Sequence, residues 1–246
     1  MPKIIQLKKD KKNFVLKTTN SSIILKYNNN TFVQTFPFFK NKHLYLFAAI
    51  KKEIMQNIKD KNIHIEKIQY RDILYFLFSP ALLRSNYIYD NVAEFDISKA
   101  YITTAHNLGL LSDSFFNKMC ELPKRIRLVI LGSIATVLVV QEFKEGKVLT
   151  TEIKNNELLS NVWRLICKTT GEAMQQLINL SGFLFFWVDG VYFNLNVTPL
   201  LHILELIENI KGYEFKQIPL ESIEKINNFC IVKKVDGISK HFFILR

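Results

Sequence analysis

The 246-residue sequence predicts an α+β fold in which an antiparallel sheet is backed by long helices. Two patterns favour this class. Short β-type runs fill residues 13–39, and from residue 87 onward strand-like and helical stretches follow one another without the regular alternation of a parallel sheet. Hydrophobic residues make up 48% of the chain, which is enough for a packed core and argues against wholesale disorder.

The first 86 residues predict a segment of strands and helices whose role the sequence does not assign. Asn-rich turns separate its β-type runs, and such punctuation favours hairpins. The expected elements are β-type runs at 13–19, 22–28 and 31–39, an amphipathic helix at Tyr45–Ile58, a half-exposed strand at 63–70, and the start of a helix at 72–78 that Ser79-Pro80 closes.

From residue 87 onward the strand and helix signals in the sequence are clearer. YIYDNVAEFDI predicts one strand with Asp96 near its end, and FLFFWVDGVYFNL predicts a hairpin with a tight turn at Asp189-Gly190. The other expected elements are short helices at 102–110 and 112–120, a helix from Pro123 to Ala135, a hairpin formed by 136–143 and 147–153, a long helix at 157–180, a helix from Thr198 to Lys211, and three final strands.

Charge and cysteine usage limit the classes of function. The net charge of +11 favours a polyanionic partner, although a bias toward Lys, Asn and Ile also fits an AT-rich genome. The three cysteines are far apart and predict neither a disulfide framework nor a zinc knuckle, so any metal is expected to be a hard cation held by carboxylates. Without an apolar run of membrane-spanning length or a signal peptide, we expect a cytoplasmic protein with no membrane partner.

Asp96 and Asp189 are the best candidates for chemistry. Taken alone, each has an ordinary structural explanation, as a strand-end residue and as part of a common turn. Both nevertheless lie in strongly apolar stretches, where an unpaired carboxylate is costly. Two carboxylates on neighbouring rigid elements are the minimum equipment for holding the paired Mg²⁺ ions of phosphoryl transfer, which sit about 3.5–4 Å apart.

FDISKAYI resembles the first palm motif of family B DNA polymerases, and WVDGVYF resembles the aspartate hairpin of the same family. The resemblance implies that Asp96, Asp189 and the backbone of Ile97 bind two Mg²⁺ ions, which Mn²⁺ can replace, and that Tyr101 excludes a 2′-hydroxyl. Lys99 stands where the family has serine, and its expected role is either a triphosphate contact or exposure to solvent. Trp187 occupies the place of the first hairpin aspartate.

Two weaker motif matches to the same family complete the resemblance. KRIRLVILGSIAT is similar to the family's fingers helix in degraded form, and it implies nucleotide contacts by Lys124 and Arg127, with a solvated helix start as the alternative. FCIVKKVDGISKHFFIL contains a K-x-F in place of the family's K-x-Y. It implies nucleic-acid contacts by Lys233, Lys234, Lys240 and Phe242, with an exposed basic hairpin as the alternative.

The resemblance therefore implies a minimal, phage-type or mobile-element DNA polymerase without an exonuclease or a full thumb. We expect a palm-like core at 87–195 with a fingers insertion at about 102–143, and residues 196–246 completing the palm. Its partners would be a DNA primer–template, dNTPs and a protein that supplies the missing thumb or processivity function. Two alternatives stay open: a non-catalytic palm that acts as a DNA-binding accessory or as one subunit of a split polymerase, and a generic nucleic-acid-binding module.

Overall fold

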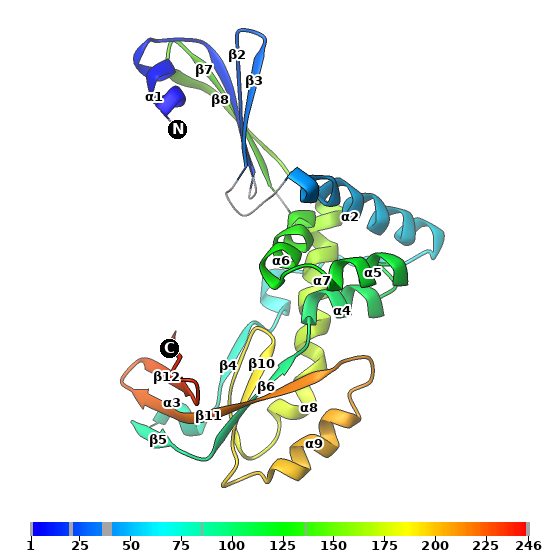
Figure 1. Cartoon of the computed structure of the whole chain (residues 1–246), viewed down its shortest axis with the longest axis vertical. Coiled ribbons are helices and arrows are strands. Elements are labelled where there is room, and N and C mark those ends of the chain that lie inside the picture. Colours follow the sequence, from blue (N-terminus) through cyan, green and yellow to red (C-terminus); the bar gives the residue numbers. More distant parts are fainter. Residues whose placement is uncertain (1, 20–21, 36–40, 85, 136, 245–246) are drawn as a thin grey trace. The chain divides into compact units, whose positions relative to one another are not determined.

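The computed structural model in Figure 1 describes residues 2–19, 22–35, 41–84, 86–135 and 137–244. The chain divides into two compact units: unit 1 consists of residues 1–67 and 109–165, and unit 2 of residues 68–108 and 166–246. Each unit combines helices with an antiparallel sheet, so the predicted α+β class is confirmed. Within the described ranges, no helix is both long enough and apolar enough to cross a membrane.

Unit 1 is built around a five-stranded antiparallel sheet of order β3-β2-β1-β7-β8. Its strands are β1 (Phe14–Thr18), β2 (Ser22–Tyr27), β3 (Asn30–Thr35), β7 (Leu138–Lys144) and β8 (Lys147–Lys154). Helix α1 (Pro2–Lys9), which the sequence did not predict, contributes Leu7 to a small core with Phe14, Leu25 and Phe143. The predicted hairpins are confirmed, except that residues 36–39 and Thr136 lie outside the described residues.

The helices of unit 1 confirm most of the helical predictions. They are α2 (Asn41–Asp60), α5 (Asp113–Cys120), α6 (Lys124–Gly132) with the 3-10 turn η2 (Ser133–Ala135), and the first part of α7 (Glu157–Ala173). Ser112 caps α5 by accepting a hydrogen bond from the Phe115 amide at 3.3 Å. Its hydroxyl also donates to Glu53 of α2, so the cap ties the two helices together.

Unit 2 contains an eight-stranded antiparallel sheet in which β13-β12-β11-β6-β10-β9-β4 are neighbours and β5 pairs with β11. The strands are β4 (Phe76–Phe78), β5 (Tyr87–Tyr89), β6 (Val92–Ile97), β9 (Phe183–Trp187), β10 (Gly190–Asn194), β11 (Phe215–Ile226), β12 (Phe229–Lys234) and β13 (Ser239–Phe243). Its helices are α3 (Pro80–Arg84), α4 (Ala100–Asn107), α8 (Gln175–Ile178) and α9 (Leu200–Glu208).

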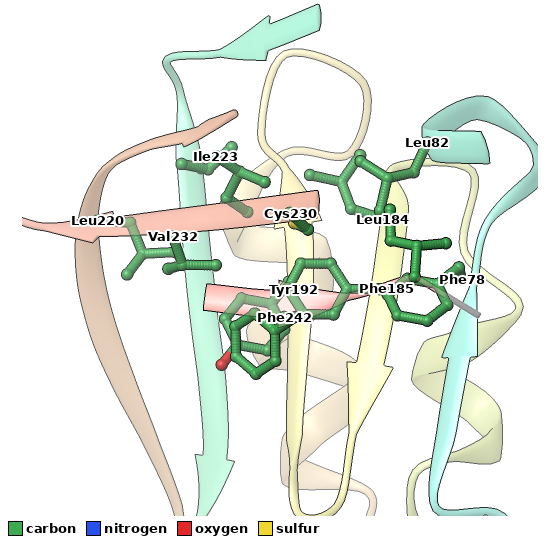
Figure 2. Close-up of a cluster of buried hydrophobic side chains, with 12 residues drawn as sticks. Phe78, Leu82, Leu184, Phe185, Tyr192, Leu220, Ile223, Cys230, Val232 and Phe242 are labelled. Atoms are coloured by element: carbon green, nitrogen blue, oxygen red, sulfur yellow. The ribbon is translucent and has the colours of Figure 1, made fainter. Parts of the chain in front are cut away.

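Side-chain alternation along β6 and β10 gives the sheet of unit 2 two apolar faces. Phe95, Val191 and Phe193 pack with Leu177 of α8 and Ile203 of α9, which back one face. On the other face, residues of β6, β9 and β10 form a cluster with Leu82 of α3 and with strands β11 to β13, as Figure 2 shows. The C-terminal strands therefore fold over the face that also carries Asp96.

Four element predictions need correction. Residues 63–69 keep the expected alternation of exposure but pair with no strand among the described residues. Phe76–Phe78 forms strand β4 against β9 rather than the start of a helix. Ser79-Pro80 begins a helix instead of closing one, because the Ser79 hydroxyl accepts the Leu82 amide at 3.1 Å and proline suits a first turn. The predicted strand at 87–97 is divided into β5 and β6, both paired with β11.

Two helix boundaries also differ from the prediction. The long helix predicted to reach Leu180 ends at Ala173 and is followed by the short α8. Helix α9 begins after Pro199, because Thr198 does not cap it. Instead the buried Thr198 hydroxyl accepts the Gly182 amide at 2.8 Å and fixes the chain before β9.

Candidate functional site

The structure brings Asp96 and Asp189 together at one end of adjacent antiparallel strands. Asp96 is the penultimate residue of β6 and pairs with Gly190, the first residue of β10. The Ile97 amide donates to the Asp189 carbonyl at 3.0 Å, which joins the end of β6 to the β9–β10 turn. Both aspartates are half-buried, so their carboxylates lie at the margin between core and solvent.

The turn that carries Asp189 differs from the expected Asp-Gly turn. Trp187 pairs with Gly190, so the two loop residues are Val188 and Asp189. Val188 has a φ of 63°, in the left-handed region that strongly disfavours a β-branched residue. The Val188 amide donates to the Tyr75 carbonyl at 2.7 Å, and this bond helps to hold the strained turn in place.

Gly190 lies next to the acidic side chains of β6 and places no side chain of its own beside them. A Cβ at this position would lie 3.6 Å from Asp96 Oδ1 and 3.4 Å from Glu94 Oε1. Any larger side chain would occupy the volume next to these oxygens. A Cβ would therefore fit here at ordinary van der Waals distance, and the backbone of Gly190 does not adopt a positive φ.

Glu94 is a member of the site that sequence reasoning missed. It lies two residues before Asp96 and therefore faces the same side of β6. Its carboxylate accepts hydrogen bonds at Oε1 from the Tyr192 hydroxyl and from Lys240 Nζ, each at 2.8 Å. Its Oε2 is buried and has no hydrogen-bond partner among the described residues. An acid two positions from Asp96 in an apolar strand was the signal that could have found it.

Burial, with smaller contributions from nearby acidic groups, raises the pKa of two tyrosines at the site. Burial, followed by the charges of Glu94, Asp96 and Asp189, raises the pKa of Tyr192 far above its usual value. Burial also raises the pKa of Tyr101, with smaller contributions from Cys167 and Asp189. Both hydroxyls therefore stay protonated at neutral pH. Tyr101 lies in the first turn of α4, four residues after the last residue of β6, and therefore at the same end of the sheet.

Two exposed lysines lie at this end of the sheet. Lys99 is exposed and adopts a left-handed φ of 56° as the residue before α4, so it redirects the chain immediately after β6. Lys216 of β11 is exposed and pairs directly with Asp96, so their side chains share one face of the sheet. Lys216 could not be identified from the sequence, because only the strand register brings it beside Asp96.

The donor set suits Mg²⁺ held partly by a substrate. Mg²⁺ in proteins commonly uses one or two carboxylates and completes its octahedron with water and substrate phosphates. Asp96 and Asp189 are two carboxylates at one end of adjacent strands, and Gly190 places no side chain beside Asp96. No cluster of three or more His, Cys, Asp or Glu side chains arranged for a metal occurs in the described part of the chain, so a dedicated all-protein cage is not present there.

The predicted fingers residues belong to unit 1, whereas both aspartates belong to unit 2. Lys124 is exposed at the start of α6. Arg127 is only 8% exposed, and its guanidinium donates to the Leu122 carbonyl at 3.0 Å. Arg127 is therefore committed to its own helix start, and the expectation of an exposed phosphate contact at this residue needs correction.

The C-terminal residues predicted to bind nucleic acid are mostly engaged within unit 2. Phe242 is 8% exposed and lies in the buried cluster of Figure 2, and its ring centre is 5.0 Å from that of Trp187. Little of its ring is therefore available to nucleic acid in this arrangement. Lys233 pairs with Glu224, whose hydrogen bond raises the pKa of the lysine. Lys240 pairs with Glu94, and Lys234 is half-buried at the base of the β12–β13 hairpin.

No known family model matches the chain, and no curated protein matches it. The assignment of function therefore depends on the geometry of unit 2 and on the motif resemblance.

Proposed function

We propose that the protein is a Mg²⁺-dependent nucleotidyltransferase of the DNA polymerase type that acts on a primer–template. One observation carries the proposal: Asp96 of FDISKAY and Asp189 of WVDGVYF, 93 positions apart in the sequence, lie on adjacent strands joined by the Ile97–Asp189 backbone hydrogen bond. This is the platform that a two-metal phosphoryl transfer requires.

In the proposed reaction each residue has a limited task, because positioning and charge stabilisation supply most of the catalysis. Asp96 and Asp189 would hold the two cations, which would activate the attacking 3′-hydroxyl and stabilise the leaving pyrophosphate. The exposed ammonium groups of Lys99 and Lys216 would contact the triphosphate. Tyr101, a protonated hydroxyl near Asp189, would lie beneath the sugar and disfavour a 2′-hydroxyl.

Primer extension with the purified full chain tests this proposal. We expect nucleotide addition with Mg²⁺ or Mn²⁺, and a loss of at least about a hundredfold in Asp189→Asn, because one removed charge-stabilising group typically costs this much. Glu208→Gln is the matched control, since Glu208 is exposed on α9 and its loss changes the net charge equally. Absence of extension by the wild-type chain, or full activity of Asp189→Asn, would contradict the enzyme proposal.

A second candidate is a palm without catalysis that binds DNA as an accessory or as a subunit of a split polymerase. The specific observation in its favour is Lys240, whose ammonium group already pairs with the carboxylate beside Gly190. Trp187, stacked on Phe76, replaces a further acid in the hairpin. DNA binding that is indifferent to Asp96→Ala, together with no Mn²⁺ binding by the wild type, would favour this candidate over the enzyme.

A further inference from the structure

The positive charge of the chain is confined to one of its two units. Unit 1 contains 22 lysines and arginines against 10 aspartates and glutamates, a net charge of +12. Unit 2, which carries the candidate site, contains 11 basic and 12 acidic residues and has a net charge of −1. Any attraction for a polyanion that depends on net charge therefore originates in unit 1.

Two turns of unit 1 gather much of this charge at one corner of the five-stranded sheet. The corner consists of the end of α1 with the following turn and of the β7–β8 turn, and we call it the lysine corner. Its exposed lysines are Lys8, Lys9, Lys11, Lys12, Lys144 and Lys147. The only acids on these two turns are Asp10 and Glu145.

Backbone contacts hold the two turns against each other. The Gly146 amide donates to the Lys12 carbonyl at 3.1 Å, and the Glu145 amide donates to Asn13 Oδ1 at 2.9 Å. A Cβ at residue 146 would lie 2.3 Å from the Lys8 carbonyl, so only glycine permits this approach. The lysines are therefore brought together by the fold of residues that are more than a hundred positions apart in the sequence.

None of the six lysines forms a salt bridge within the described residues. Lys8 Nζ lies 4.8 Å from the centre of the Phe143 ring, which is itself buried and stacked on Phe14. Because Phe143 is covered, the corner offers charge without an aromatic platform on its two turns, which suits phosphate contacts rather than base stacking.

We propose that the lysine corner is the surface through which this protein holds the phosphate backbone of nucleic acid, without selecting a sequence. The choice of nucleic acid over another polyanion rests on the proposed function. The corner takes the place of Lys233 and Lys240, which were expected to serve this purpose but are paired with Glu224 and Glu94.

Two triple variants of equal charge test the proposal in the full chain. Lys9→Gln, Lys12→Gln and Lys147→Gln remove half of the corner and leave Lys8 on Phe143. The control combines Lys52→Gln, Lys59→Gln and Lys118→Gln, three exposed lysines on helices α2 and α5 of the same unit. Circular dichroism of both variants confirms that they are folded before binding is measured.

The readout is the salt dependence of binding to a short DNA duplex of mixed sequence. Each lost phosphate contact reduces the slope of log K against log salt by about 0.9, so the corner variant should show a slope smaller by about 2 to 3 and at least about tenfold weaker binding at 0.1 M salt. The control should bind like the wild type. Equal affinities and slopes in the two variants would overturn the proposal.

Two further experiments distinguish this proposal from the proposed enzymatic function and from binding to a lipid surface. Primer extension is measured with the same wild-type chain. If that chain binds DNA through the corner but never extends a primer, the proposed function fails and the corner proposal stands. Vesicles of phosphatidylserine and phosphatidylcholine test the other common polyanion. Binding to vesicles that requires the corner lysines, with no such requirement for DNA, would overturn the nucleic-acid assignment.

Discussion

Replacing Lys240 with methionine tests the buried charge pair next to the candidate site. Lys240 supplies one of the two hydrogen bonds received by Glu94, whose side chain is 3% exposed, whereas that of Lys240 is 39% exposed. The variant Lys240→Met keeps the length of the side chain but leaves a buried carboxylate with a single neutral donor. Hydrogen bonds to charged groups contribute about 1.5–3 kcal/mol, and solvent at the partly exposed lysine favours the lower end, so we expect a loss of about 1.5–2 kcal/mol.

The double variant Glu94→Gln/Lys240→Met shows whether Glu94 and Lys240 stabilise each other in the folded state. Because it removes the buried charge as well as its partner, it should be more stable than Lys240→Met alone. The expected coupling energy is about 1 kcal/mol or more. An additive result, with the double variant losing at least as much as the two single variants together, would refute the view that Lys240 compensates a buried charge.

Urea unfolding followed by tryptophan fluorescence provides the assay. The chain has two tryptophans, Trp163 in unit 1 and Trp187 in unit 2, so a Trp163→Phe background reports on unit 2 alone. Trp187 packs 5.0 Å from Phe242 in the cluster that Lys240 borders along β13. Lys211→Met, at an exposed lysine of the same unit, should change the unfolding free energy by less than about 0.5 kcal/mol.

Three more predictions concern the same unit. Gly190→Ala should fold normally, because the added Cβ makes no contact shorter than 3.4 Å. It should nevertheless weaken Mn²⁺ binding measured by calorimetry, because the methyl group fills the space beside Asp96, and unchanged affinity would contradict the metal assignment. Val188→Gly should raise the unfolding free energy by about 1 kcal/mol in urea titrations, since it removes left-handed strain, and a loss of stability would show that Val188 contributes more through packing. Burial raises the pKa of Cys167 and of Cys230 to about 12. The stability that these neutral thiols contribute to unit 2 should therefore be fully present below about pH 9 and be lost as the pH rises from 9 to 12. Cys230→Ala should reduce this loss in unfolding curves measured across that range.

Local patterns predicted most elements because they depend on neighbours in sequence. Ser112 caps its helix as expected, and alternation located β6, β9 and β10. The same local signals misassigned Ser79-Pro80, because a serine followed by proline also begins a helix when its hydroxyl meets an amide three residues later. Residues 63–69 alternate like a strand, but alternation does not specify a pairing partner.

The candidate site shows which information a sequence lacks. Asp96 and Asp189 could be paired in advance only because a family resemblance supplied the pairing. Glu94, Lys216 and Lys240 needed the register of β6 with β10 and β11 and the return of β13 over the same face. Long-range register is set by the packing of whole sheets, and no local window contains it.

The same reasoning explains why the sequence drew attention to the C-terminal lysines rather than to the lysine corner. Interleaved lysines and phenylalanines near the C-terminus suggested a nucleic-acid surface, but strand alternation sends Phe242 into the core and leaves Lys240 within reach of Glu94. The lysines of the corner are divided between the N-terminus and residues 144–147, so neither run is distinctive by itself. Only the pairing of β1 with β7 joins them. A charged surface that binds a long polyanion is a property of tertiary structure, and the net charge of each folding unit, +12 against −1, is the quantity that directs attention to the lysine corner.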